Sequence, residues 1–210
     1  MATCQCDRME SKFDEPFVAE KLDLYRESGP DASTLALLDA LRSDDVTGRT
    51  LLDVGGGVGA IQHGLLRSGV ISAQEVEASA AYVTACNAEA ERQGHADRIT
   101  HLLGDLQSVA DQVQPADIVT LDRSLCCWPD MSDLVARSAA LATWRYGLVY
   151  PRDTPWVHYG WRLYSSLRQA LNRNAMRVSA HRRAEVEAIL SRHSLRPHSH
   201  VEVGLRQVAV

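Results

Sequence analysis

Short apolar runs alternate along the chain with stretches of helical periodicity, a pattern typical of an α/β protein built on a mostly parallel sheet. The apolar runs predict strands within residues 50–54, 74–77, 99–103, 116–121 and 146–150. Helices are predicted over residues 60–66, 80–93, 131–142 and 182–193. Residues 196–203 and 205–210 predict a terminal hairpin, which places the last strand antiparallel between the fifth and the sixth.

The residues before the first strand differ from this pattern. Apolar side chains are spread through charged sequence up to a turn at Gly29-Pro30, and a helix is predicted over residues 33–41 with Ser33 as its cap. Its apolar face carries Leu35, Leu38 and Leu41. We therefore predict an N-terminal helical arm or lid at residues 1–45. One domain follows at residues 46–210, with an aromatic insert at about 151–180.

Residues 50–59, TLLDVGGGVG, contain the most informative motif. Glycines follow an apolar run that ends in Asp53, and a helix is predicted to begin at Ala60. Glycines let the backbone turn sharply and approach a ligand, and the N–H groups of a helix start can face that ligand. A plain core turn is one alternative, and a dinucleotide site of the pattern G-x-G-x-x-G/A is another. Asp53 would repel a pyrophosphate but attract the ammonium of a methionine moiety, which favours S-adenosylmethionine.

The stretch LDVGGGVG resembles the first motif of class I S-adenosylmethionine-dependent methyltransferases, in which an acid and G-x-G-x-G follow a strand. The resemblance implies an α/β fold with a Rossmann-like class I methyltransferase sheet, mostly parallel with a C-terminal antiparallel hairpin. It also implies S-adenosyl-L-methionine as the cofactor.

Three further positions complete the predicted cofactor site. Glu77 ends the second strand about 20 residues past the glycines, where an acid binds the ribose hydroxyls. A surface glutamate is the alternative for Glu77. In the family, a Gly-Asp after the third strand, here Gly104-Asp105, accepts the adenine amino group, and the Leu106 backbone meets the ring edge. The predicted cofactor residues are Asp53, Gly55, Gly57, Gly59, Glu77, Ala78, Gly104, Asp105, Leu106 and Asp122.

The methyl acceptor is expected beside residues 122–130, DRSLCCWPD, because open α/β sheets bind ligands at the carboxyl ends of their strands. The aromatic insert would form a lid for a flat or apolar substrate, or its rings would merely pack onto the core. Methyl transfer depends mainly on alignment, although a hydroxyl or amine acceptor would need a base. The candidate catalytic residues are Asp122, Tyr150, His158 and His181, and any of the histidines could instead be a packed or surface residue.

A narrower resemblance covers most of the chain. The arm with Phe13, the spacer to LDVGGGVG, the Leu121-Asp122 loop with Pro129, and RVSAHRRAEVEAIL are similar to magnesium-protoporphyrin O-methyltransferases and their bacterial relatives. Those enzymes methylate a propionate carboxylate. The chain has Cys-Trp-Pro where the family often has His-Tyr-Pro, and Ser179 where it has an aromatic. We expect methyl transfer to a small-molecule acceptor on oxygen, either a carboxylate or a hydroxyl.

The sequence leaves other functions open. The acceptor atom could be nitrogen, sulfur or a thiol-bound metalloid, the last held by a set of four thiols at Cys4, Cys6, Cys126 and Cys127. These pairs are unlike C-x-x-C, so no structural metal site is expected. The chain could also bind S-adenosylmethionine without catalysis. A nicotinamide dehydrogenase is opposed by Asp53 and by the terminal hairpin.

Composition and charge exclude some classes of partner but do not indicate a reaction type. The formal net charge of −5 gives no basic field to gather phosphates, so nucleic acid is not an expected partner. The arginines at 177, 182 and 183 are either a solvated helix end or a site for an acidic group. No apolar run is long enough to span a membrane, and the N-terminus lacks an apolar signal core. Five cysteines fit reduced thiols, so a cytoplasmic location is expected. The oligomeric state is left open.

Overall fold

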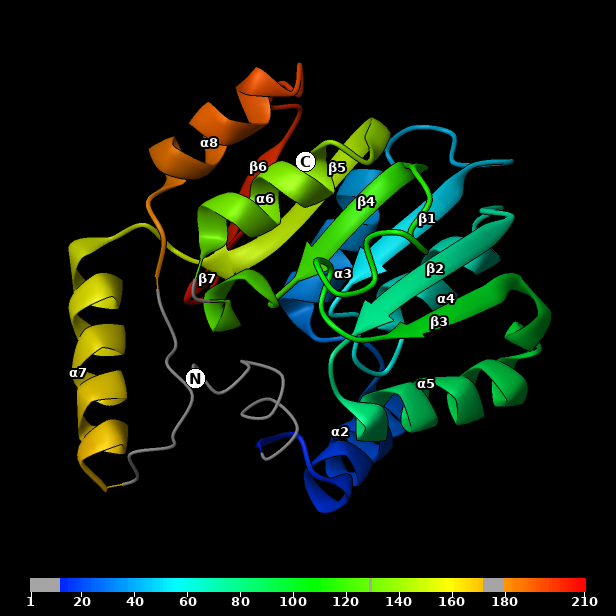
Figure 1. Cartoon of the computed structure of the whole chain (residues 1–210), viewed down its shortest axis with the longest axis horizontal. Helices are drawn as coiled ribbons and strands as arrows, with labels where there is room; N and C mark the ends of the chain where they lie inside the picture. Colours follow the sequence, from blue (N-terminus) through cyan, green and yellow to red (C-terminus); the bar gives the residue numbers. More distant parts are fainter. Residues whose placement is uncertain (1–11, 129, 172–179) are drawn as a thin grey trace.

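A seven-stranded sheet forms the centre of the molecule in a computed structural model, which describes residues 12–128, 130–171 and 180–210 (Figure 1). The strand order is β3-β2-β1-β4-β5-β7-β6. The strands are β1 (Thr50–Val54), β2 (Ser72–Glu77), β3 (Ile99–Leu103), β4 (Ala116–Asp122), β5 (Ala142–Pro151), β6 (His200–Val203) and β7 (Arg206–Ala209). The first five strands pair in parallel, and β7 pairs antiparallel with both β5 and β6. This arrangement confirms the predicted fold class and the placement of the last strand.

Helices cover both faces of this sheet (Figure 1). They are α2 (Glu15–Ser28), α3 (Ala32–Leu41), α4 (Ala60–Arg67), α5 (Ala80–Gln93), α6 (Met131–Ala139), α7 (Pro155–Leu171) and α8 (Arg183–Arg192), with short 3-10 helices at Ala96–Arg98 and Leu125–Cys127. Helices α3, α4 and α5 lie on one face, and α6 packs with α8 on the other. Helix α2 packs on α5, while α7 stands apart from the sheet.

Two hydrophobic clusters hold these layers together, one on each face of the sheet. Side chains alternate along a strand, so Leu51 joins the cluster beneath α3 and α4, whereas Leu52 joins the cluster beneath α6. Because both faces are covered, most positions of the central strands β1 and β4 are apolar on both sides, which explains their hydrophobic runs.

Three local predictions were wrong. Helix α3 is capped by Asp31, whose carboxylate accepts hydrogen bonds from the backbone N–H groups of Ser33 and Thr34 at 2.9 and 3.1 Å. Leu35 is 43% exposed, and Leu37 takes the expected place in the core. The helix predicted over residues 131–142 ends at Ala139, and the fifth strand begins already at residue 142, because pairing with Ala116 on β4 overrides the local helical pattern.

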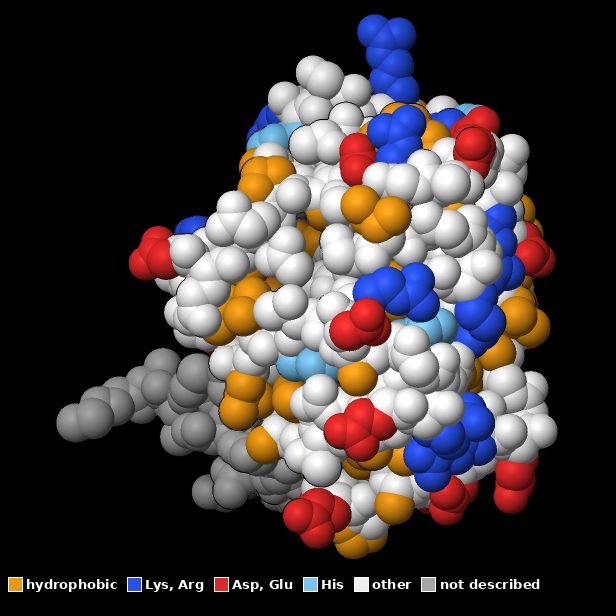
Figure 2. Space-filling view, turned by 90° about the vertical axis from the view of Figure 1, so that its right-hand side faces the viewer, with side chains coloured by type: hydrophobic (Ala, Val, Ile, Leu, Met, Phe, Trp, Pro, Cys, Tyr) orange, Lys and Arg blue, Asp and Glu red, His pale blue; other side chains and the backbone are white. Residues whose placement is uncertain are grey.

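The surface shows no separation of charge on the side of the molecule drawn in Figure 2. Lys and Arg side chains are interspersed there with Asp and Glu, and no continuous basic surface is visible among the described residues of that face. Among the described residues, no helix is both long enough and apolar enough to cross a membrane.

Candidate active site

The glycine turn after β1 has the backbone conformation that its sequence predicts. The backbone φ angles of Gly55, Gly57 and Gly59 are 74°, 60° and 79°. Residues other than glycine adopt such positive φ angles only with strain. Gly59 is also the N-cap of α4, and no side chain in the described part of the chain caps that helix start. The first N–H groups of α4 are therefore available to a ligand, as the motif requires.

Gly56, which lies outside the spaced glycine motif, is the most tightly confined of these glycines. A Cβ atom at this position would lie 2.7 Å from Asp53 Oδ2 and 2.8 Å from Glu75 Oε1. The turn therefore presses directly onto a group of buried acids. The spaced glycine motif does not assign this role to Gly56, although the uninterrupted run of glycines at 55–57 indicates it.

Asp53 lies under the turn and is fully buried. Its carboxylate accepts hydrogen bonds from Thr120 Oγ1 at 2.7 Å and from Gln62 Nε2 at 3.3 Å. Burial raises the pKa of Asp53 to about 7, and the negative charge of Glu75 adds to the shift. A cationic ligand group nearby would lower the cost of ionising this carboxyl, which fits its predicted role as the ammonium partner.

Asp53 belongs to a polar row that crosses four strands. Strand register places Asp53 beside Glu75 on one side and Thr120 on the other, and it places Glu75 beside His101. Glu75 and His101 are in direct side-chain contact. Side chains adjacent in register share a face, so this row lies on the side covered by α4 and α5. No local sequence pattern connects these residues, because only the strand register brings them together.

Glu77 lies at the end of β2, as predicted, and is bound by the backbone of the site. Its carboxylate accepts from Gly57 N at 3.3 Å and from Ser79 N at 2.9 Å. Burial raises the pKa of Glu77 to about 7, with Glu75 contributing. Ala78 follows it and is half-buried. The contact with Gly57 joins the predicted ribose acid to the glycine turn.

The third part of the predicted cofactor site follows β3. Gly104 N donates to Glu77 O at 2.9 Å, so this turn lies next to the end of β2. Asp105 Oδ1 accepts from the backbone N–H groups of Gln107 and Ser108, at 3.0 and 2.8 Å. The Leu106 side chain is buried in the core. The structure thus brings Gly104 and Asp105 to the expected edge of the sheet.

Asp122, at the end of β4, is held in a network that reaches α3. It accepts from Thr34 Oγ1 at 2.6 Å and from Arg123 Nε at 3.1 Å. Arg123 also pairs with Asp31, and Arg206 Nη1 lies 3.4 Å from the same Asp31 carboxylate. Burial acts to raise the pKa of Asp31, but the Arg123 charge and local hydrogen bonds outweigh it and hold this pKa at about 2. The Asp122 carboxylate therefore orients the side chains of Thr34 and Arg123 through these hydrogen bonds.

A pocket of about 490 Å³ opens beside this network. It is lined by Asp31, Ala32, Ser33, Arg123, Cys126, Tyr150, Pro151, Trp161, Val203, Gly204, Leu205 and Arg206. Tyr150 is buried, and burial raises the pKa of its hydroxyl, so it remains protonated at neutral pH. The wall is mostly apolar, with two guanidinium groups. The two arginines were not predicted as site residues. They lie 83 positions apart in the sequence, so no local pattern indicates that they share a pocket.

The two candidate histidines lie in different surroundings. His181 hydrogen-bonds to the Leu125 backbone in the loop after β4, and burial lowers its pKa. Its Nε2 atom is buried and has no hydrogen-bond partner in the described part of the chain. His158, on α7, pairs instead with Asp153 through a 2.7 Å contact. Only His181 is shown in contact with the loop expected to hold the acceptor.

The cysteine pair in this loop forms a coupled unit. Cys126 Sγ and Cys127 Sγ lie 3.7 Å apart. The hydrogen bond from Cys126 lowers the pKa of the Cys127 thiol to about 7. Cys4 and Cys6, the other members of the predicted thiol set, lie outside the described residues, as do Pro129, Arg177 and Ser179.

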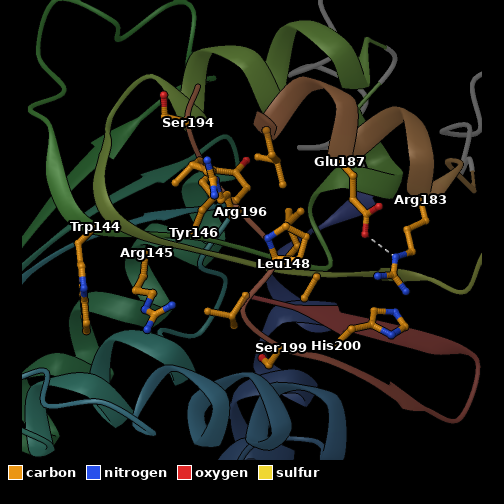
Figure 3. Close-up of a pocket in the computed structure, with 15 residues that line it drawn as sticks. Trp144, Arg145, Tyr146, Leu148, Arg183, Glu187, Ser194, Arg196, Ser199 and His200 are labelled. Atoms are coloured by element: carbon orange, nitrogen blue, oxygen red, sulfur yellow. Dashed lines mark hydrogen bonds and ion pairs between the residues drawn. The ribbon is translucent and has the colours of Figure 1, made fainter. Parts of the chain in front are cut away.

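A second, smaller pocket of about 110 Å³ is lined on β5 by Trp144, Arg145, Tyr146 and Leu148 (Figure 3). Arg183 and Glu187 on α8 face each other at its edge, with a 2.5 Å contact from Nε to Oε1. Arg145, at the other side in Figure 3, pairs with Asp44. These paired arginines fit the interpretation of a solvated helix end for the Arg183 cluster.

The strand order, the glycine turn and the terminal antiparallel pair together define the fold of the class I S-adenosylmethionine-dependent methyltransferases. No protein-family model and no curated protein matches the sequence. Solved structures do match. Magnesium protoporphyrin IX methyltransferase from Synechocystis PCC 6803, solved with bound SAH, has a TM-score of 0.75 and 16% identity over 98% of this chain and 97% of that chain.

Two further structures support the same fold. An O-methyltransferase family protein from Burkholderia thailandensis has a TM-score of 0.73 and 17% identity. The match covers 95% of this chain but only 61% of the Burkholderia protein. The mitomycin 7-O-methyltransferase has a TM-score of 0.62 and 18% identity, over 84% of this chain and 52% of that chain. At these identities the likeness establishes the fold.

Proposed function

We propose that this protein is an S-adenosylmethionine-dependent methyltransferase that methylates an oxygen atom, preferably a carboxylate, on a small and largely apolar acceptor. The glycine turn, Asp53 and Glu77 supply the cofactor side. The Synechocystis protein of the same fold has been solved with bound SAM and with bound SAH, which supports this cofactor.

The observation that carries the choice of acceptor is the pair of arginines in the larger pocket. Arg123 and Arg206 both contact the Asp31 carboxylate, so their guanidinium groups already converge on one carboxylate position. Arginine binds carboxylates well because its planar fork can donate two hydrogen bonds. Tyr150 and Trp161 provide apolar and aromatic wall beside it. An acidic molecule with a flat or apolar body fits such a pocket.

The arginine pocket lies next to the glycine turn. Ser124, directly after Arg123, is so close to Gly55 that a Cβ atom on Gly55 would lie 2.6 Å from Ser124 Cβ. Tyr82 lies 3.7 Å from the corresponding position on Gly57, and its hydroxyl is within the electrostatic influence of Arg123. A cofactor on the turn and an acceptor in the pocket would therefore be neighbours.

Methyl transfer requires little else from the chain. An acceptor oxygen forms a bond to the methyl carbon as the carbon–sulfur bond breaks, and the electron pair of that bond stays on sulfur. A carboxylate is already ionised at neutral pH, so no base has to remove a proton. The chain's part is to align the two groups and exclude water. Tyr150, His158, His181 and Asp122 are then positioning groups.

The test is incubation with methyl-labelled S-adenosylmethionine and a panel of small carboxylic acids, phenols, amines, thiols and arsenite. The proposal predicts a labelled ester or ether of an apolar acid or phenol. Label on nitrogen, sulfur or arsenic would contradict the oxygen acceptor while leaving the cofactor assignment intact. Tight cofactor binding without any labelled product would indicate a binding module instead.

A second candidate, methylation of a thiol-bound metalloid, is favoured by one observation. The adjacent Cys126 and Cys127 thiols lie close together, and the lowered pKa of Cys127 supplies a thiolate at neutral pH. In this case arsenite would be the methylated compound, and Cys127→Ser would abolish the reaction. In the carboxylate mechanism the same variant keeps most of its activity.

The domain organisation belongs to the same proposal. We interpret residues 1–45 as an arm over the site and residues 151–180 as a lid. Phe13 contacts Tyr82 with ring centroids 5.4 Å apart, which brings the arm close to the glycine turn. Trp156 on α7 is 85% exposed, so it is free to cover a bound molecule. A cytoplasmic location and a small-molecule acceptor rather than nucleic acid complete the proposed function.

A further inference from the structure

We propose that Glu75, Cys86 and His101 form a binding site for one zinc ion beneath the glycine turn. A carboxylate oxygen, the thiol sulfur and an imidazole nitrogen from these residues all lie within 4.8 Å of one another. Carboxylate, thiolate and imidazole are the three side-chain ligand types that zinc uses in proteins.

Rigid elements bring these ligands together. Glu75 on β2 and His101 on β3 are direct neighbours in the parallel register. Cys86 lies on α5, which packs over both strands. The side chains of Glu75 and Cys86 are completely buried, and that of His101 is 9% exposed. Ligands held on strands and a helix keep their geometry better than ligands held on loops.

The hydrogen bonding of the group is incomplete. Glu75 Oε2 contacts His101 Nδ1, but Glu75 Oε1 and His101 Nε2 are buried and have no hydrogen-bond partner in the portion of the chain that the structure describes. Folded proteins rarely leave buried polar atoms unpaired, because an unpaired buried atom loses its hydrogen bonds to water without replacement. A cation bound to this carboxylate would satisfy it.

The local charge points the same way. Asp53, Glu75 and Glu77 are three buried acids on two adjacent strands. A zinc ion bound to one carboxylate and one thiolate carries no net charge, so it would neutralise Glu75 without leaving a buried excess of positive charge.

The dimensions require only a small adjustment. With zinc–sulfur bonds of about 2.3 Å and zinc–nitrogen or zinc–oxygen bonds of about 2.0–2.2 Å, tetrahedral ligand atoms are about 3.3–3.8 Å apart. The three ligand atoms lie within 4.8 Å of one another, so no separation exceeds these values by more than about 1.5 Å. Gln62 Oε1 lies 3.6 Å from Cys86 Sγ and can provide the fourth ligand, or a water molecule can. Binding displaces the thiol proton of Cys86 to the solvent.

Cobalt titration of the full chain tests the site. The chelator-treated, reduced protein should bind one equivalent of Co²⁺ with a near-ultraviolet thiolate-to-cobalt charge-transfer band and the intense visible bands of a tetrahedral site. One equivalent of Zn²⁺ should remove these bands. Cys86→Ser should lose the charge-transfer band, whereas the matched Cys126→Ser/Cys127→Ser double variant should retain it. Absence of the band in the wild-type chain, or its loss only in the double variant, would overturn the proposal.

A second measurement does not depend on how Cys86→Ser folds. X-ray absorption at the zinc edge of the wild-type protein should show one sulfur ligand, with nitrogen and oxygen as the others. Two or more sulfur ligands would instead indicate a cysteine-rich site, and no sulfur would exclude Cys86; either result rejects the proposed site. His101→Ala should weaken zinc binding at least tenfold in competition with a chromophoric chelator, and unchanged affinity would contradict its role as a ligand.

Discussion

The two halves of the sheet edge that form the candidate site present different charged groups. Under the glycine turn, β1 and β2 contribute the buried acids Asp53, Glu75 and Glu77. Beyond β4, the larger pocket presents the guanidinium groups of Arg123 and Arg206, which pair with the carboxylates of Asp31 and Asp122. The proposed methyl donor is cationic at its sulfonium and ammonium, and the preferred acceptor is anionic. Each half is therefore complementary to one of the two molecules that must meet.

The halves also differ in how their charges are held. The acids are buried and bonded to the backbone and to neighbouring polar groups. The Arg123 and Arg206 side chains are 41% and 44% exposed and pair only with Asp31 and Asp122 among the described acids. Changes in the acidic half should consequently affect cofactor binding and stability, whereas changes in the arginine half should affect the acceptor.

The largest expected effect comes from Asp53→Ala. Removing the carboxylate leaves the methionine ammonium without its partner, so affinity for S-adenosylmethionine should fall at least about a hundredfold, or about 2.7 kcal/mol. Titration calorimetry measures this change, and circular dichroism checks the fold. Asp53→Asn keeps the shape and a hydrogen-bond acceptor for Thr120 but not the charge. Normal affinity in that variant would show that charge is not what the acidic half contributes.

The arginine half should respond differently. Arg206→Ala should raise the KM for an acidic acceptor about 10- to 100-fold, as expected for the loss of a charge-assisted hydrogen bond, and leave cofactor affinity unchanged. Arg137→Ala is the matched control, since Arg137 pairs with Asp133 on α6. Steady-state kinetics and cofactor calorimetry on both variants separate the two halves. A parallel loss of cofactor affinity in Arg206→Ala would break the division.

Glu77→Ala should have an intermediate effect on the cofactor side. Loss of the acid that joins the glycine turn to the end of β2 should weaken cofactor binding by about 1 to 3 kcal/mol. Activity should survive when the cofactor is saturating. An unchanged dissociation constant would remove Glu77 from the site.

The pH dependence of stability should also belong to the acidic half. The folded-state pKa values of Asp53 and Glu77 are raised to about 7, so the folded protein binds more protons than the unfolded chain between about pH 4 and pH 7. Their contribution to the free energy of unfolding is greatest below about pH 4 and is lost as the pH rises through about 7. Denaturation of the cofactor-free protein at about pH 5 and pH 8 should show this fall, and Asp53→Asn should show a smaller one. A steeper fall in Asp53→Asn would contradict the sign.

The smallest and most variable effects are expected for the groups that could act as bases. His181→Ala, His158→Phe and Tyr150→Phe should each retain measurable turnover on a carboxylate, because no proton has to be removed. Losses should come from misplacement of the acceptor. Single-turnover rates would reveal an essential base if one variant alone lost the chemical step while keeping cofactor affinity.

The sequence was sufficient to predict where two members of the acidic half lie, Asp53 in the first strand and Glu77 at the end of the second, but it did not identify Glu75. A buried strand, an acid, a glycine turn and a helix start are contiguous in residues 50–67. The local pattern therefore predicts their structure and leads to the interpretation of this segment as a cofactor site. The predicted position of the last strand, antiparallel between the fifth and the sixth, is confirmed by the structure. The predicted bounds of strands β1 to β4 are close to those in the structure.

The arginine half could not be predicted in the same way. Asp31, Arg123 and Arg206 come from three distant segments, and only the pairing of β5 with β7 and the packing of α3 bring them together. Asp31 had a local indication, since an aspartate before a helix is a preferred cap. The polar row through Glu75 and His101 depends on strand register, which no local pattern specifies.

The most direct test of the account is a comparison of two acceptors that differ only in charge. An apolar carboxylic acid that the enzyme methylates and its neutral primary amide would be offered with methyl-labelled S-adenosylmethionine to the wild-type protein and to Arg206→Ala. The account predicts a base-labile methyl ester from the acid, little or no product from the amide, and a loss of preference for the acid in the variant. Equal methylation of acid and amide by the wild-type protein would contradict it.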